Sequence, residues 1–348
     1  MTQGERIKNM NLNEIANQLV APRVGIMAAD RPSPAFYDLM RSEGIPTDEH
    51  AYRNWSELLF LAPGLSESIS GIIMTDEQTR LRDSRGESLI EQVVERGMIP
   101  GISPSKGMVA LAGSDGETVG SGLDGLRERL AEYADMGVGF SKWRAAFQIG
   151  PGTPSYYAIE ANAYVMAQVA ALSQEAGIVP IVEPEVMLWG DHTIERCFAV
   201  TEWVLSRTFE TLYLHRVNLE GTLVKASMVL SGYQCAEQAD VETVAEQTVK
   251  VFRRGIPAAI PGIVFLSGGQ SDYQATAHLN AMNANYEMPW KLSFSYARAL
   301  QREPMAIWAN RPEKVSAAQA ALLHRAKMNG LASLGLWTKE LEGEAVAP

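Results

Sequence analysis

The sequence predicts an α/β protein whose eight parallel strands close into a (β/α)8 barrel, the TIM-barrel architecture. Eight short apolar runs alternate with long amphipathic segments along 348 residues, the pattern of a parallel sheet with helices between its strands. Hydrophobic residues make up 46% of the chain and charged residues 20%, which is typical of a globular protein. The alternative is a doubly wound open sheet, but no Gly-x-Gly-x-x-Gly motif follows the first apolar run, which weakens a dinucleotide-binding interpretation.

Each expected strand is a short apolar run that ends in polar, glycine or proline residues. In chain order these runs are residues 24–29, 71–75, 99–103, 139–143, 178–182, 216–219, 262–266 and 291–294. Helical periodicity or helix-capping residues mark the segments between them, most clearly 126–137, 155–175, 191–212 and 240–254. We expect one barrel domain over residues 1–348, with a helical extension at 1–20 and a mobile polar tail at 339–348.

Charge and composition narrow the classes of partner. The net charge of −11 argues against a nucleic acid or an anionic membrane as the partner of the whole surface. No apolar run reaches 18 residues, the N-terminal sequence is polar, and only Cys197 and Cys235 occur, so we expect a cytoplasmic protein. The five histidines have no metal-ligand spacing, and we expect no metal.

Charged side chains gather where the expected strands end, which is where barrels carry their chemistry. They are Asp30, Lys142, Arg144, Glu183, Glu185, Lys225 and Arg298. Lys142 and Arg144 have the same parity on one strand, as do Glu183 and Glu185 on the next, so each pair shares a face. Any one of these residues alone would suit a salt bridge at the barrel rim, but together they favour an active site.

Lys225 is the candidate nucleophile. Apolar neighbours and a second cation such as Lys142 would lower its pKa and expose the amine lone pair. The free amine could form a Schiff base with a ketone, and the resulting iminium would draw electrons from an adjacent carbon–carbon bond. Glu183 and Asp30 could then transfer the protons. The alternative is a surface lysine whose alkyl chain covers apolar neighbours.

A glycine loop follows the seventh expected strand. Backbone N–H groups of Ser267, Gly268 and Gly269 can approach an anion closely, because glycine has no Cβ in the way. Loops after the seventh and eighth strands commonly bind phosphate in barrels. The guanidinium group of Arg298 could donate two parallel hydrogen bonds to a phosphate there.

The sequence resembles class I fructose-bisphosphate aldolases over nearly its whole length. The matching stretches are "GLDGLRERLAEY", "FSKWR", "GIVPIVEPE", "LEGTLVKASMV", "FLSGGQS" and "SFSYARALQ", in the order and spacing of the family. This resemblance implies a barrel, a Schiff-base mechanism that needs no metal or other cofactor, a sugar phosphate as the ligand, and commonly a homotetramer.

The resemblance also implies roles for individual residues. Lys225 matches the Schiff-base lysine, Glu183 the acid/base glutamate, and Lys142 the neighbouring lysine, which Glu185 would orient. Asp30 matches the aspartate that handles the C4 hydroxyl, and Arg144 matches a site arginine. The residues that match the C1-phosphate site are Ser267, Gly268 and Arg298, preceded by Ala297 where the family usually has glycine.

The distal end of the site departs from the family pattern. The family usually follows its first aspartate with Glu-Ser-Thr-Gly-Ser and a Lys-Arg pair, and ends its third strand in Gly-Ile-Lys, to hold the C6 phosphate. This chain has Arg31, Pro32, Ser33, Pro34 and Ala35, then Asp38 and Leu39, and Ser103 in place of the lysine, with Lys106 nearby. The two prolines also disfavour a helix directly after Asp30. The C-terminal tyrosine of many animal members is absent.

We therefore expect a class I aldolase that cleaves a ketose 1-phosphate to dihydroxyacetone phosphate and an aldehyde. Each charge-assisted hydrogen bond contributes about 1.5–3 kcal/mol, so the loss of several would strongly weaken the binding of a sugar bisphosphate. The candidate specificity residues are Arg31, Ser33, Ser103 and Lys106. One alternative is a glycolytic fructose-1,6-bisphosphate aldolase that yields glyceraldehyde 3-phosphate. The other is a non-catalytic sugar-phosphate-binding or scaffold protein on the same fold.

Overall fold

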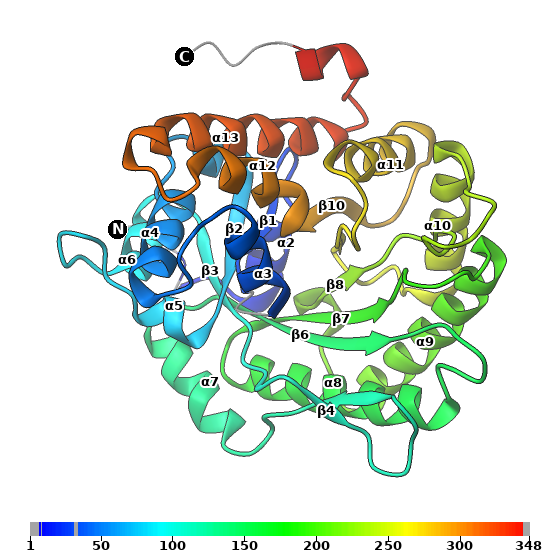
Figure 1. Ribbon diagram of the computed structural model, residues 1–348. Coiled ribbons are helices and arrows are strands. Elements are labelled where there is room, and N and C mark those ends of the chain that lie inside the picture. The colour runs from blue at the N-terminus through cyan, green and yellow to red at the C-terminus, as the bar shows by residue number, and fades with distance from the viewer. Residues whose placement is uncertain (1–6, 8, 31–33, 344–348) are drawn as a thin grey trace.

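A closed barrel of eight parallel strands forms the centre of the molecule (Figure 1). The computed structural model describes residues 7, 9–30 and 34–343, without the side chains of 34–36 and 39. Around the barrel the strands follow the order β1, β10, β9, β8, β7, β6, β3, β2 and back to β1. They are β1 (Gly25–Ala28), β2 (Ile69–Met74), β3 (Ile99–Ile102), β6 (Phe140–Phe147), β7 (Val179–Val186), β8 (Leu223–Ala226), β9 (Gly262–Phe265) and β10 (Lys291–Tyr296). The predicted (β/α)8 barrel is confirmed.

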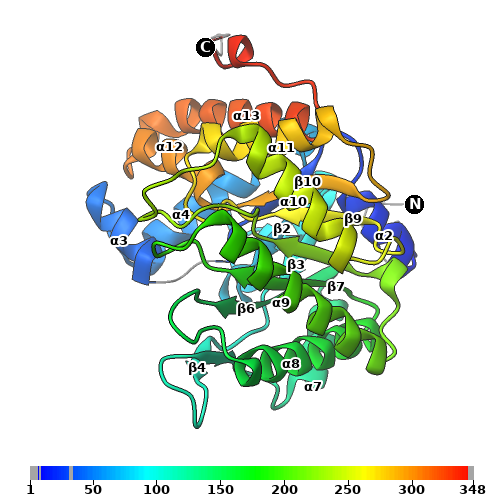
Figure 2. The ribbon, with the colours of Figure 1, turned by 90° about the vertical axis from the view of Figure 1, so that its right-hand side faces the viewer.

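Helices surround the barrel and alternate with its strands. They are α2 (Leu12–Leu19), α3 (Pro34–Ser42), α4 (Glu49–Phe60), α5 (Asp76–Arg80), α6 (Leu89–Glu95), α7 (Leu126–Asp135), α8 (Tyr156–Glu175), α9 (Ile194–Leu214), α10 (Val241–Gly255), α11 (Asp272–Asn285), α12 (Arg298–Trp308) and α13 (Val315–Ala332). Side-chain caps start several of them: Ser155 accepts from Ala158 N–H in α8, and Asp240 accepts from Thr243 N–H in α10. A two-stranded hairpin, β4 (Met108–Ala110) and β5 (Thr118–Gly120), projects beside the barrel (Figure 2).

The sixth barrel strand lies at Leu223–Ala226, so the prediction of a strand at 216–219 is wrong. Arg216 adopts a left-handed φ of 56°, and Leu219–Gly221 form the 3-10 helix η2. The backbone of Asn218 is bound by the Gln174 side chain, which donates to its carbonyl and accepts from its N–H. That contact with the end of α8 removes the segment from the sheet. As a consequence Lys225 stands on a barrel strand itself.

Helix α2 closes the N-terminal end of the barrel, and Figure 2 shows it at the opposite end of the molecule from α3. Asn11 and Glu14 form a reciprocal capping box at its start. Leu19 and Val20 pack against strand glycines so closely that a Cβ at Gly71 would lie 2.9 Å from Leu19, and one at Gly262 would lie 2.8 Å from Val20. This apolar plug leaves the other end of the barrel for polar residues.

Helix α3 begins at Pro34, only four residues after Asp30. The expectation that the prolines disfavour a helix here is therefore wrong for Pro34. Proline is tolerated at the first helical position, where its missing N–H would have no partner in the helix and its fixed φ suits the turn. Residues 31–33, which include Pro32, lie outside the described residues.

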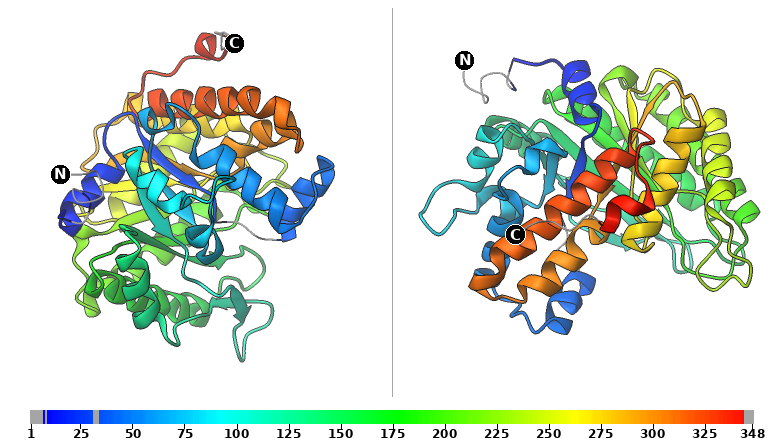
Figure 3. Two further views of the ribbon diagram at one scale, coloured as in Figure 1. Left: turned by 90° about the vertical axis from the view of Figure 1, so that its left-hand side faces the viewer. Right: turned by 90° about the horizontal axis from the view of Figure 1, so that it is seen from above.

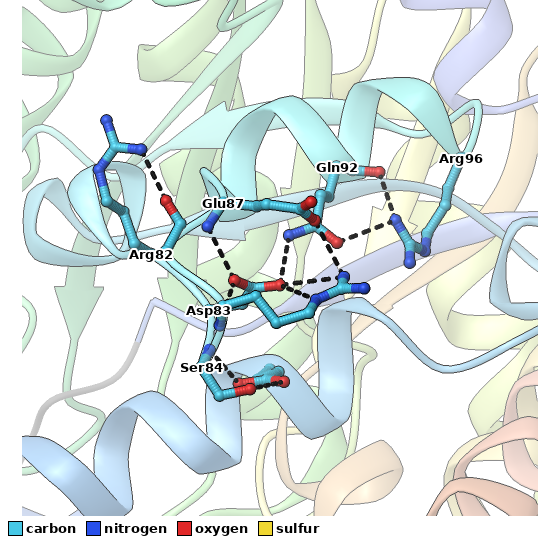
Figure 4. A network of polar contacts seen from close by, with 9 residues as sticks. Arg82, Asp83, Ser84, Glu87, Gln92 and Arg96 are labelled. Carbon is cyan, nitrogen blue, oxygen red and sulfur yellow. Dashed lines mark hydrogen bonds and ion pairs between the residues drawn. The ribbon is translucent and has the colours of Figure 1, made fainter.

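The loop between α5 and α6 is organised around the buried carboxylate of Asp83 (Figure 4). Asp83 accepts hydrogen bonds from the backbone N–H groups of Arg85 and Glu87 and from the side chain of Gln92. Burial alone would raise the pKa of Asp83, but these hydrogen bonds outweigh it and lower the pKa to about 2. The loop is thus fixed by its own contacts, outside the cavity described below.

The C-terminal helices α12 and α13 pack side by side along one flank of the barrel (Figures 1 and 3). Beyond them, the first part of the expected tail forms the 3-10 helix η4 (Lys339–Gly343). Glu342 in η4 accepts hydrogen bonds from Arg325 of α13 and from the Trp337 indole. This part of the segment therefore has defined contacts, and residues 344–348 lie outside the described residues.

Candidate active site

A cavity of about 940 Å³ opens at the carboxyl ends of the barrel strands. Most of the residues predicted for the site line it. They are Asp30, Ser103, Lys106, Lys142, Arg144, Glu183, Glu185, Lys225, Ser267, Gly268 and Arg298. Gly269 lies next to this lining in the loop after β9, and Arg31 and Ser33 lie outside the described residues. The cavity thus brings together predicted residues from seven strands or the loops that follow them.

Two lysines and two carboxylates form one buried cluster at the centre of the cavity. The Nζ atom of Lys142 lies 2.6 Å from Asp30 Oδ2 and 3.1 Å from Glu183 Oε2. The other Glu183 oxygen, Oε1, lies 3.1 Å from Nζ of Lys225. All four side chains are at most 7% exposed. Glu183 therefore bridges the two lysines.

The barrel register explains this convergence. Strand β7 lies between β6 and β8, and it pairs Ile181 with Lys142 and with Leu223. Glu183 and Lys225 each stand two residues further along their strands, so they point to the same face as those partners. The two lysines therefore reach Glu183 from either side, while Asp30 reaches Lys142 from the end of β1.

The two lysines have opposite pKa shifts. Burial lowers the pKa of Lys225, and the charge of Lys142 adds to this effect, so that together they outweigh the attraction of Glu183 and Asp30. Burial also acts to lower the pKa of Lys142, but there Asp30 and Glu183 outweigh it and raise the pKa overall. Lys225 is consequently the residue that gives up its proton more easily, and Lys142 remains the cation.

Glu183 stays ionised despite its burial. Burial alone would raise the pKa of its carboxyl group, but Lys142, Lys225 and Arg144 outweigh that effect and lower the pKa. No described residue donates a well-aligned hydrogen bond to its Oε2 atom, although the Lys142 ammonium is close by. This carboxylate therefore keeps an acceptor position for a hydroxyl or water in the cavity.

Glu185 forms an ion pair with Arg144, not with Lys142 as the sequence resemblance implied. Arg144 on β6 and Glu185 on β7 stand two residues beyond Lys142 and Glu183, one level higher in the barrel. At that level Arg144 is the cation within reach, since Asp30 and Glu183 already surround Lys142. Asp30 and Glu183 therefore take the orienting contact with Lys142 that we had expected from Glu185.

One end of the cavity has the features of an anion site. Ser267 and Gly268, from the loop after β9, line it beside Ala297 and Arg298 at the start of α12. A helix N-terminus with a nearby guanidinium favours a phosphate. Ala297 has a φ of −105°, outside the left-handed region that favours glycine, so this φ does not require the glycine that the family usually has.

Besides Ser103 and Lys106, the opposite end is lined by residues that the sequence analysis did not single out. Two arginines there are already engaged: Arg80 pairs with Asp76 and Glu132, and Arg129 donates to backbone carbonyl groups. Asp76 and Glu77 directly follow β2, so the strand-end rule applied to that strand would have found them. Arg129 and Glu132 come from α7, for which the sequence carried no such signal.

The described residues hold neither a metal-binding cluster nor a helix that could span a membrane. In residues 7, 9–30 and 34–343, no group of three or more His, Cys, Asp or Glu side chains is arranged to hold a metal ion. Within the same part of the chain, no helix has the length and apolar character needed to cross a membrane.

Comparison with known proteins gives consistent matches over nearly the whole chain. The family model of fructose-bisphosphate aldolase class-I matches residues 11–347. A probable fructose-bisphosphate aldolase class 1 of Xanthomonas campestris is 49% identical over 94% of this chain and 98% of its own length. Fructose-bisphosphate aldolase 2 of Caenorhabditis elegans is 43% identical over 97% of this chain and 92% of its own length.

A solved structure agrees with these sequence matches. Fructose-bisphosphate aldolase from Plasmodium falciparum, in complex with TRAP and a small molecule inhibitor, is similar with a TM-score of 0.92 and 38% identity. The match covers 94% of this chain and 95% of that one.

Proposed function

Because this chain belongs to the class I fructose-bisphosphate aldolase family, and is accordingly an aldehyde-lyase, we propose that it acts through a Schiff base on Lys225. The observation that carries this proposal is the pair of buried lysines on one carboxylate, with the pKa of Lys225 lowered and that of Lys142 raised. An amine must lose its proton before it can attack a ketone, and a protonated neighbour favours that loss.

The remaining groups of the cluster have places in the proposed cycle. Lys225 gives one proton to Glu183 and, as the neutral amine, attacks the C2 carbonyl of a ketose. Glu183 then returns that proton to the hydroxyl of the carbinolamine, which leaves as water and gives an iminium. Asp30 takes the proton of the C4 hydroxyl as the C3–C4 bond breaks, and the bonding electrons move into the iminium to form an enamine. Protonation at C3 and hydrolysis then release dihydroxyacetone phosphate and regenerate the amine. Lys142 stays charged and stabilises the oxygen anions that develop beside it.

We propose a ketose 1-phosphate as the substrate, with an aldehyde half that lacks a phosphate. The cavity end near Arg298 suits the 1-phosphate, whereas the opposite end offers few cations to a second one. Its two arginines are engaged with Asp76, Glu132 and carbonyl groups, and Glu77 adds a further negative charge. Among the described residues Lys106 is the lysine at that end, and Ser103 stands where the family usually has a lysine.

Steady-state kinetics test this substrate. We expect a higher kcat/KM for fructose 1-phosphate than for fructose 1,6-bisphosphate. Activity should persist in the presence of a metal chelator and should be absent in Lys225→Met. Ser103→Lys should raise the kcat/KM for the bisphosphate roughly tenfold to hundredfold, the value of one charge-assisted hydrogen bond, and leave the monophosphate nearly unchanged. A large preference of the unaltered protein for the bisphosphate would favour the glycolytic alternative, and activity retained in Lys225→Met would refute the mechanism.

Two further proposals concern the assembly and the location of the protein; the first rests on the family and the second on the composition of the sequence. We propose a homo-oligomer, a tetramer as is common in the family, and a cytoplasmic location. Light scattering of the purified protein tests the first, and a monomeric mass would contradict it.

A further inference from the structure

Tyr233 contacts the glycine loop of the anion site from outside. It lies in the segment between β8 and α10, and its hydroxyl donates to the carbonyl oxygen of Gly268 across 2.9 Å. Its own N–H is bound to the carbonyl of Leu188 at 3.0 Å, and the ring of Trp189 meets the Tyr233 ring edge-on, with 5.4 Å between centroids. The phenol is therefore held on the loop by its backbone and by its ring.

The loop needs this restraint because of its conformation. Gly268 and Gly269 have φ values of 60° and 105°, in the left-handed region where two successive glycines are free to move. A Cβ at Gly269 would lie 3.1 Å from the Tyr233 hydroxyl and 3.4 Å from a guanidinium nitrogen of Arg298. The loop, the phenol and the arginine thus meet at one point.

The orientation of one peptide group follows from the hydrogen bond. In a trans peptide the C=O and the next N–H point in opposite directions. When Tyr233 holds the Gly268 carbonyl, it keeps that oxygen turned to the phenol and turns the Gly269 N–H to the other side of the loop. If the peptide rotated, a carbonyl oxygen could face the bound phosphate and repel it.

We propose that Tyr233 is a positioning residue for the 1-phosphate, which fixes the Gly268–Gly269 peptide so that its N–H and not its oxygen is presented to the anion. This inference rests on the proposed function, since it assigns a group to the phosphate of the same substrate. Burial raises the pKa of the Tyr233 phenol to about 12, although Arg298 acts against this shift, so the phenol keeps the proton that it donates.

Tyr233→Phe tests the proposal because it removes the hydroxyl and keeps the ring against Trp189. A matched control is Tyr273→Phe, since Tyr273 also meets a tryptophan, Trp337, edge-on with 5.2 Å between centroids. The measurement is the concentration of ketone that gives half-maximal trapping on the enzyme by borohydride, for dihydroxyacetone phosphate and for phosphate-free dihydroxyacetone.

We expect Tyr233→Phe to raise this concentration roughly threefold to tenfold for dihydroxyacetone phosphate, as for one neutral hydrogen bond, and to leave it unchanged for dihydroxyacetone. Tyr273→Phe should change neither. Equal changes for both ketones would show a merely structural role, and no change for either would show that the hydrogen bond does not position the loop; both results overturn the inference. Absence of any adduct in the unaltered protein would instead refute the proposed function, and the inference with it.

Discussion

Replacing Lys142 with methionine tests the charge balance inside the barrel. The substitution keeps a long, unbranched side chain but leaves two buried carboxylates, Asp30 and Glu183, without their shared cation. With an effective dielectric constant of about 20, the attraction across 2.6 Å to Asp30 is worth about 6 kcal/mol and that across 3.1 Å to Glu183 about 5 kcal/mol. The cost of burying the ammonium offsets most of this sum, and breaking a buried ion pair typically costs about 3–5 kcal/mol.

The loss should depend on pH in a defined direction. In the unaltered protein the pKa of Glu183 is lowered, so its charge stabilises the fold above the ordinary carboxyl range and this contribution is lost as the pH falls. Without Lys142, repulsion from Asp30 and burial raise the pKa of Glu183, and the variant loses stability as the pH rises through that value. The raised pKa of Lys142 itself matters only in the alkaline range.

We therefore expect Lys142→Met to lower the free energy of unfolding by about 3–5 kcal/mol at pH 8, and by clearly less at pH 5. Urea denaturation followed by tryptophan fluorescence at the two pH values measures both numbers. Arg127→Met is the control, because its partner Glu175 and Arg127 itself are 56% and 64% exposed, and its effect should be small and independent of pH. An equal loss at both pH values, or none at pH 8, would refute the charge assignment.

Two further predictions concern neighbouring groups. Burial lowers the pKa of Lys225, and the charge of Glu183 opposes that shift. Glu183→Gln should therefore lower the pH at which Lys225 reacts half-maximally with an acylating reagent, as measured by peptide mass spectrometry. A shift of this pH to a higher value would contradict the account. Ala297→Gly should leave the KM for fructose 1-phosphate unchanged, because the φ of −105° at this position does not require glycine. It should lower the free energy of unfolding by about 0.4–1 kcal/mol, since glycine gains conformational freedom in the unfolded chain. A lower KM in the variant would show that alanine weakens substrate binding.

The strand-end rule predicts the centre of the site from sequence because strand geometry is regular. Successive residues of a strand alternate between faces, and parallel strands all end at the same rim, so Asp30, Lys142 and Glu183 had to converge. Lys225 joins them from a strand that the sequence analysis had placed too early in the chain. The rule failed for the position of the sixth strand. Residues 216–219 alternate polar and apolar side chains as a strand does, and their contact with Gln174, more than 40 residues earlier, is not visible in the local sequence.

The sequence also could not predict which charged side chains form ion pairs with one another. Parity placed Glu183 and Glu185 on one face, but it could not decide which cation each would meet, and Glu185 pairs with Arg144. At the distal end Arg129 reaches from α7 to the carbonyl groups of Pro104 and Gly122. Such contacts depend on how helices pack on the barrel, which no strand pattern reveals.

Reductive trapping tests the central claim most directly. Borohydride reduces an iminium to a stable secondary amine, so incubation with dihydroxyacetone phosphate should leave one reduced adduct on the peptide that contains Lys225. The account predicts this adduct in the unaltered protein, in the presence of a chelator, and its loss in Lys225→Met. An adduct on Lys142 instead, or a protein that cleaves ketose phosphates without any trapped adduct, would contradict it.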